Sequence, residues 1–253
     1  MIQATLLANA GVLLQYRDTA VLVDGIYGSE PHYFSNLKPG VWEQMLRGEG
    51  LFEKIDYLLF THDHPDHFSP EMTMEFLRAR AVKGVFLPDS PAVKESGLTA
   101  FLTERSIPFI CLSQETGKAA YRMEKGVTVR AIPTRHLDKK FQHVQHLCYL
   151  LTFGEKHLLF TADADYTQER FESIRRFFPL QAAFINPLFF GALRHGRFFN
   201  GELDARLTCV YHVPFEGDDP VNMRATLTRD LADWPQEKGN VLVLDESLRC
   251  IYL

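Results

Sequence analysis

Residues 62–67 bring together side chains that bind divalent metal ions, in the run His62-Asp63-His64-Pro65-Asp66-His67. Imidazole nitrogens and carboxylate oxygens suit zinc and related ions. One residue separates His62 from His64, so both rings can fall on the same side of a locally extended segment and share one ion. Asp66 and His67 follow the bend at Pro65 and are better placed to reach a second ion nearby. A solvated polar loop is the competing interpretation of the same residues.

A strand and a helix are predicted to flank this run. The apolar residues Tyr57-Leu58-Leu59-Phe60 indicate a short buried strand before it, and Ser69-Pro70-Glu71 after it have the features of an N-cap, a first turn and an acidic helix start. We therefore predict a helix from Pro70 to Arg80. The candidate ligands would lie on a strand-to-helix turn, where side chains can converge and the helix N-terminus adds a partial positive charge.

Together with Thr61, the run resembles the metal-binding motif of the metallo-β-lactamase-fold superfamily, and the resemblance covers nearly the whole chain. It implies an α/β fold, namely a four-layer αβ/βα sandwich of two facing mixed β-sheets with outer helices. Residues 1–253 would form a single domain of this kind.

The resemblance implies three further ligands far along the chain. His136 follows a predicted strand over Val127 to Pro133 and would complete the first site, although taken alone it would more often be a structural or surface histidine. His212 follows a predicted strand over Leu207 to Tyr211 and would complete the second site. Asp163 would bridge both ions. The implied sites are therefore His62, His64 and His136 at one metal ion and Asp66, His67 and His212 at the other, with Asp163 between them.

One departure from the family pattern concerns this bridging carboxylate. The family motif at this place is Thr-Gly-Asp, whereas this chain has Thr161-Ala162-Asp163. The difference is sterically small, but it leaves Asp165 as a competitor for the bridging role.

Two hairpins of similar pattern suggest two similar halves. Residues Val12 to Asp24 and Tyr149 to Phe160 each form a predicted hairpin whose second strand runs toward an aspartate. Asp24 is expected either to orient a metal-bound histidine or to cap backbone N–H groups of its own turn. Among the histidines without an implied ligand position, His146 is the best placed to approach the site.

Two segments are candidates for substrate binding. The long connection from Ile26 to Glu53 contains Tyr33 and a predicted helix from Val41 to Arg47, and it is either a lid over the site or a helix packed on the core. The aromatic and cationic segment from Phe189 contributes Arg194, His195 and Arg197 as a candidate wall for an anionic substrate, with a solvated loop as the alternative. Further helices are predicted over Gln168 to Phe178 and from Pro220 to Leu231.

Composition narrows the class of protein and its partners. A net charge of -5 gives no broad basic field, so no nucleic-acid partner is expected. The four cysteines form no Cys-x-x-Cys pair, which argues against a zinc knuckle and a disulfide framework and favours a cytoplasmic protein. Neither a signal peptide nor a membrane-spanning segment is predicted.

These features predict a metal-dependent hydrolase, in the branch that resembles ascorbate-phosphate lactonases and other small-molecule hydrolases. Two divalent ions, with zinc expected and manganese or iron as alternatives, would hold a bridging hydroxide as nucleophile, because the pKa of such a water falls from about 15.7 toward 7. Asp66 and Asp163 are the candidate catalytic carboxylates, and the substrate would be a small ester, lactone or phosphodiester. An iron-dependent redox enzyme similar to the sulfur dioxygenases, or a metal-binding protein without turnover, remains the alternative.

Overall fold

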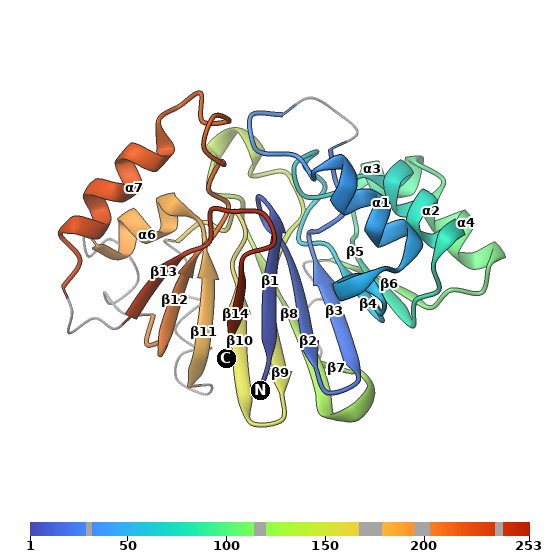
Figure 1. Ribbon diagram of the computed structural model, residues 1–253. Coiled ribbons are helices and arrows are strands. Elements are labelled where there is room, and N and C mark those ends of the chain that lie inside the picture. The colour runs from blue at the N-terminus through green and yellow to red at the C-terminus, as the bar shows by residue number, and fades with distance from the viewer. Residues whose placement is uncertain (29–31, 114–119, 167–178, 195–202, 236–239) are drawn as a thin grey trace.

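The computed structural model describes residues 1–28, 32–113, 120–166, 179–194, 203–235 and 240–253 (Figure 1). Its strands form two seven-stranded sheets. The first sheet has the order β14-β1-β2-β3-β4-β5-β6. Its strands are β1 (Gln3–Ala8), β2 (Gly11–Tyr16), β3 (Thr19–Val23), β4 (Tyr57–Leu59), β5 (Gly84–Pro88), β6 (Phe109–Leu112) and β14 (Cys250–Tyr252).

The second sheet has the order β13-β12-β11-β10-β9-β8-β7. Its strands are β7 (Ala120–Arg122), β8 (Val127–Thr134), β9 (His146–Phe153), β10 (Lys156–Phe160), β11 (Leu180–Ile185), β12 (Leu207–Val210) and β13 (Asn240–Val243). Both sheets have the same sequence of orientations: four antiparallel strands are followed by strands that add in parallel. The two hairpins seen in the sequence, β2-β3 and β9-β10, occupy the same place in each sheet, so the predicted similarity of the halves is confirmed.

Helices cover the outer face of each sheet (Figure 1). The first sheet carries α1 (Pro39–Arg47), α2 (Pro70–Ala79), α3 (Pro91–Glu95) and α4 (Leu98–Glu104), and the second carries α6 (Pro187–Arg194) and α7 (Met223–Ala232). The short 3-10 turns are Gly50–Phe52, Glu124–Gly126 and Lys139–Phe141. The expected four-layer sandwich of two mixed sheets with outer helices is therefore confirmed.

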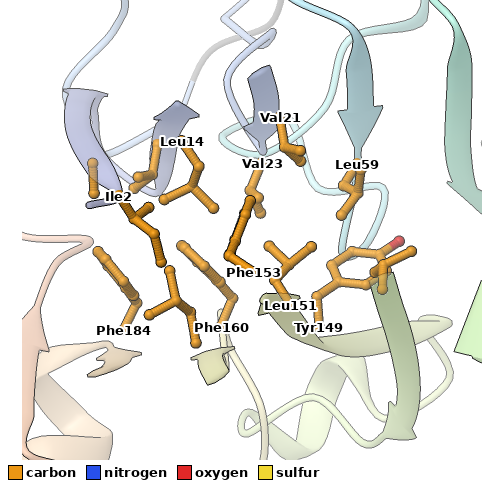
Figure 2. Close-up of a cluster of buried hydrophobic side chains, with 14 of the residues drawn as sticks. Ile2, Leu14, Val21, Val23, Leu59, Tyr149, Leu151, Phe153, Phe160 and Phe184 are labelled. Carbon is orange, nitrogen blue, oxygen red and sulfur yellow. The ribbon is translucent and has the colours of Figure 1, made fainter. Parts of the chain in front are cut away.

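Alternation along the strands produces three apolar layers. In β9, the buried side chains of Tyr149 and Leu151 face the first sheet, whereas Leu150 faces the helices of its own half. Figure 2 shows the central layer, in which Leu14 and Val23 of the first sheet meet Phe153 and Phe160 of the second. Burial of this layer does not depend on any group bound at the edge of the sheets.

The predicted strand-to-helix turn is present between β4 and α2. The Ser69 hydroxyl accepts a hydrogen bond from the Met72 N–H, and Pro70 occupies the first turn, where a missing N–H has no cost. This cap fixes the start of α2 and hence the length of the turn that carries residues 62–67.

Two elements differ from the sequence-based expectations, and a third expectation concerns residues that the structure does not describe. Residues from Phe189 to Arg194 belong to helix α6 and bury Phe189 and Phe190 in the core, so the solvated loop considered for this part of the segment is wrong. Helix α7 begins at Met223 instead of Pro220, because Asn222 adopts φ 55° and the Asp219 carboxylate caps the Met223 and Arg224 N–H groups. The helix predicted over Gln168 to Phe178 lies outside the described residues.

None of the helices in the described part of the chain combines the length and apolar character needed to cross a membrane.

Candidate metal centre

Two groups of potential metal ligands lie side by side and share one carboxylate. In each group, the candidate ligand atoms all lie within 4.8 Å of one another. The first group is His62, His64, His136 and Asp163, and the second is Asp66, His67, Asp163 and His212. All seven residues singled out in the sequence are therefore brought together, although up to 150 positions separate them in the chain.

The topology explains this convergence. His136, Asp163 and His212 each follow a strand of the second sheet, namely β8, β10 and β12. Strand β8 is antiparallel to β9, which is antiparallel to β10, so β8, β10 and the parallel strand β12 end at the same edge. The backbone N–H of Leu147 at the start of β9 donates to the Thr61 carbonyl, which places the turn after β4 opposite that edge.

Asp163 occupies the centre of the cluster. Its Oδ2 lies 3.5 Å from His136 Nε2, 3.5 Å from His67 Nε2 and 3.8 Å from His62 Nε2. Its Oδ1 lies 3.6 Å from His212 Nε2. Both groups of ligands are thus within reach of one carboxylate, whereas Asp165 belongs to neither group.

The donor atoms suit a divalent cation. The Nε2 atoms of His62, His64 and His136 are buried and have no hydrogen-bond partner. Such unpaired buried nitrogens are costly unless something binds them, and a metal ion is the partner that three converging imidazoles accept. In the second group, the Nε2 atoms of His67 and His212 lie 2.9 Å apart and point at the same space.

Asp24 orients the histidines of the turn after β4. It is fully buried, and its carboxylate accepts hydrogen bonds from the Thr61 N–H at 2.8 Å, the Thr61 hydroxyl at 2.6 Å and His67 Nδ1 at 2.9 Å. The Thr61 oxygen in turn lies 3.0 Å from His62 Nδ1. With Nδ1 protonated in both rings, the Nε2 lone pairs of His62 and His67 face the site. Both roles considered for Asp24, a histidine partner and a backbone cap, are therefore present together.

His136 is held in a different way. Its Nδ1 accepts a hydrogen bond of 3.0 Å from the backbone N–H of Asp138. In the neutral ring, the proton then lies on Nε2, which faces Asp163. Binding of a cation at Nε2 would therefore require this proton to move to Nδ1, which gives up the hydrogen bond from Asp138.

Other polar side chains hold the ligands from behind, and two of them were not identified from the sequence. Asn186 donates from Nδ2 to the Ala162 carbonyl and to Asp163 Oδ1, and its own oxygen accepts the Phe189 N–H at the start of α6. Asn9 donates from Nδ2 to Asp66 Oδ2 and to the Asp66 carbonyl. An asparagine at a strand end is the only signal of either role in the sequence, and it is too common to identify one.

His146 approaches the site as expected, but from behind Asp163. Its Nε2 accepts the backbone N–H of Asp163 at 3.1 Å, and its Nδ1 lies 2.7 Å from the Thr134 hydroxyl. Because Nε2 is an acceptor here, the ring proton is on Nδ1 and points to Thr134. His146 therefore positions the backbone of Asp163 and does not face the cavity.

Several residues at strand ends around the site have left-handed backbone conformations. Asn9, Asp24, Ala162 and His212 have φ values of 47°, 46°, 44° and 59°. Residues other than glycine adopt this conformation at a cost of roughly 1–2 kcal/mol, and such costs are concentrated at functional sites. The value at Ala162 gives a physical reason for the glycine that the family motif has at this position.

The electrostatics of the cluster favour an ionised carboxylate at Asp163 but act on the buried rings of His62 and His67 in opposite directions. Burial lowers the pKa of His62 well below its usual value, with a further contribution from the nearby His67. Burial would raise the pKa of Asp163, but His212, His136 and His67 outweigh it and hold this pKa well below the usual range. Burial likewise opposes a charge on His67, yet Asp66, Asp163 and Asp24 raise its pKa well above normal. Asp163 and His62 are thus already in the protonation state that binds a cation, whereas His67 has to lose its added proton first.

Of the four residues expected to bind substrate, one lines the cavity next to the cluster in the described part of the chain. Tyr33 lines it. Arg194 forms ion pairs with Asp230 at 2.7 Å and with Asp233, so its guanidinium is engaged with α7 and the residue that follows it. His195 and Arg197 lie outside the described residues. Substrate contacts by these four residues stay a prediction.

Comparison with known proteins identifies the family and the fold. The model of the β-lactamase superfamily domain matches residues 20–197. The structure is similar to that of a possible metal-dependent hydrolase from Veillonella parvula, with a TM-score of 0.68 and 15% identity over 100% of both chains. It is also similar to the diiron β-hydroxylase CmlA from Streptomyces venezuelae, with a TM-score of 0.62 and 19% identity over 100% of this chain and 54% of that one.

A shorter match links the chain to a curated relative. Over 89 residues it is 35% identical to a protein named "Putative Rieske 2Fe-2S iron-sulfur protein" from Mycolicibacterium smegmatis. The match covers 35% of this chain and only 16% of that relative.

The single domain expected over residues 1–253 stays a prediction, because the family model covers a shorter range. The length of this match, the sandwich of two sheets and the histidine-rich turn after β4 all agree with one family. This chain belongs to the β-lactamase superfamily and has the metallo-β-lactamase fold.

Proposed function

We propose that this protein is a hydrolase that uses two divalent metal ions to cleave a small ester, lactone or phosphodiester. The observation that carries the proposal is the pair of ligand groups that share Asp163, with three buried ring nitrogens unpaired. Two ions held there would lower the pKa of a shared water toward about 7 and polarise the carbonyl or phosphoryl oxygen of the substrate.

The side chains of this protein have separate tasks in such a reaction. Asp163 holds the two groups of ligands at a fixed separation, and Asp24 fixes the ring orientation of His67 directly and of His62 through Thr61. Asp66 is the second candidate catalytic carboxylate. Burial opposes its charge, but His67 and His212 outweigh burial and keep its pKa well below normal, so Asp66 Oδ2 is an ionised but weak proton acceptor.

An iron-dependent redox enzyme is the second candidate. The fold similarity to CmlA supports it, because that protein is a diiron β-hydroxylase. An enzyme with a single iron would need only the first group of ligands, whereas Asp66, His67 and His212 form a complete second group here. This second group favours the hydrolase over a mononuclear iron oxygenase.

Metal content and activity measured together test the proposal. Protein purified without added metal should contain about two ions of zinc or manganese per chain and should hydrolyse members of a lactone and phosphodiester panel. One iron per chain with thiol-dependent oxygen uptake would instead establish the redox candidate. Bound metal without turnover on any substrate would indicate a binding protein.

Substitution of one candidate ligand tests the assignment of the first group. His64→Ala should lower turnover at least about a hundredfold and remove one ion, because it deletes a ligand of the first group. Its unfolding free energy should fall by about 1 kcal/mol or less, since the central apolar layer holds the sheets together. His157→Ala, at the start of β10 and far from Asp163 along the strand, is the control and should keep both ions. Full activity of His64→Ala would contradict the assignment.

A further inference from the structure

A cavity of about 410 Å³ lies directly against the candidate metal ligands. Its floor includes His64, His136, Asp163 and His212, and its volume is in the range of small-molecule sites. Its walls come from different parts of the chain: the segment before α1, the turn after β8, and the starts of α6 and α7. The chemistry of these walls therefore indicates which substrate group can lie beside the reacting bond.

Aromatic side chains stand against the ligand histidines on two sides. The Phe141 ring centroid lies 4.6 Å from that of His64 and 5.4 Å from that of His136, in edge-to-face arrangements. On the other side, Phe34 lies 4.2 Å from His212. Any group that extends from the metal centre into the cavity thus passes between aromatic walls.

The remaining walls are also mostly apolar. Leu188 on the first turn of α6, Met223 at the start of α7 and Leu137 after β8 line the same space. Phe141, Leu188 and Tyr33 are 40%, 52% and 79% exposed. Large apolar side chains left in water around one opening indicate a surface that a ligand covers.

Basic side chains are missing from the described lining of this cavity. Its charged groups other than histidine are the carboxylates of Asp66, Asp138 and Asp163. The nearest candidate cation on α6, Arg194, is engaged with Asp230 and Asp233. A substrate carboxylate or sulfonate placed in the cavity beyond the metal centre would meet apolar walls or like charge, which is unfavourable.

We propose that the substrate carries an uncharged apolar group of about the size of a phenyl ring, which packs against Phe141, Leu188 and Met223 beside the hydrolysed bond. This inference rests on the proposed hydrolase function and names its substrate class. It replaces the anionic substrate expected from Arg194, His195 and Arg197 as the preferred class. Phe141, Leu188 and Met223 are then specificity-determining residues.

Two esters with the same leaving group test the preference. Ethyl hydrocinnamate carries a phenyl ring where monoethyl succinate carries a carboxylate, and both release ethanol. With the metal-loaded protein, and after correction for their rates in alkali, kcat/KM should be at least about tenfold higher for the phenyl ester. A higher value for monoethyl succinate would overturn the inference while leaving the hydrolase proposal intact.

A charge at the mouth of the cavity should change this ratio. Leu188→Arg places a cation at an exposed helical position and should lower the ratio of phenyl ester to succinate at least about fivefold. Tyr252→Arg is the matched control, because Tyr252 is 65% exposed on β14 and pairs with Gln3 at the end of the sheet opposite the site. The control should keep the wild-type ratio. An unchanged ratio in Leu188→Arg would contradict the placement of the apolar group.

Binding to the metal-free protein separates the two proposals. Met223 lines the cavity, so its methyl resonance in protein labelled with carbon-13 methionine, assigned through Met223→Leu, reports on occupancy. Hydrocinnamyl alcohol should shift this resonance, whereas γ-hydroxybutyrate should not. A shift with the alcohol, but no hydrolysis by metal-loaded protein of either ester or of any member of the lactone and phosphodiester panel, would retain the apolar pocket and reject the hydrolase. No shift with the alcohol, or a larger shift with γ-hydroxybutyrate, would reject the apolar pocket.

Discussion

Two aspartates occupy equivalent places in the two halves of the molecule and do different work. Asp24 follows β3 and Asp163 follows β10, and each of these strands is the second strand of the hairpin that leads into the parallel part of its sheet. Both turns contain a left-handed residue, which is Asp24 itself in one half and Ala162 in the other. The carboxylates nevertheless differ in position, because Asp24 is the first residue after its strand and Asp163 is the third.

This shift of two residues decides where each carboxylate points. Asp24 is fully buried and uses its oxygens for Thr61 and His67, so none of it is left for a metal ion. Asp163 directs its oxygens to the ring nitrogens of both ligand groups, and its backbone is held by His146. One half therefore supplies the support for the histidine turn, and the other supplies the central ligand. We expect substitutions at the two positions to affect different properties.

The largest effect is expected for Asp24→Ala in the metal-free protein. The substitution leaves the Thr61 N–H, the Thr61 hydroxyl and the His67 ring without their buried acceptor, which should lower the unfolding free energy by about 3–5 kcal/mol. Chemical denaturation of the metal-free protein measures this change in unfolding free energy. Asp18→Ala is the control, because Asp18 lies in the turn of the same hairpin with its side chain 71% exposed, and its removal should change the unfolding free energy far less. Equal stabilities of the two variants would remove the supporting role from Asp24.

Asp163→Asn should show the opposite division between stability and metal binding. The amide oxygen can still accept from Asn186, so the unfolding free energy should fall by no more than about 1–2 kcal/mol. Metal content should drop below two ions and kcat/KM at least about a hundredfold, because a neutral amide is a poor bridging ligand. Asp165→Asn, in the same turn, should keep both ions. If Asp165→Asn loses them instead, the bridging role belongs to Asp165.

How much of this arrangement the sequence predicts depends on the range of the interaction. The turn from His62 to His67 is local, so its spacing and the Ser69 cap were enough to predict its geometry. The places of His136, Asp163 and His212 came from the family resemblance, since residues this far apart meet only through the order of the strands. Asn9 and Asn186 have no local signal, because their contacts depend on how the two sheets face each other.

The error at α6 has a physical cause as well. Phe189, Phe190 and Gly191 with the following cations suggested an exposed loop, but both aromatic rings are buried in the layer between the second sheet and its helices. The Asn186 side chain starts that helix by accepting the Phe189 N–H. Arg194 then falls in the last turn, where it can reach Asp230 of α7. Tertiary packing and a capping side chain together overrode the local sequence signal.

A smaller effect is expected where Asp163 is supported, and it sharpens the contrast with Asp24. His146 holds only the backbone N–H of Asp163, so His146→Leu should leave the carboxylate in place but less firmly oriented. Metal affinity, measured by competition with a chromophoric chelator, should fall about 10–100-fold, as for other residues that orient ligands. His146→Gln retains an acceptor and should bind metal more tightly than His146→Leu. If His146 only filled space, the two variants would bind metal equally well. Because His146 contacts the backbone N–H of Asp163 and leaves its carboxylate unchanged, the loss of metal affinity in His146→Leu should remain below that in Asp163→Asn.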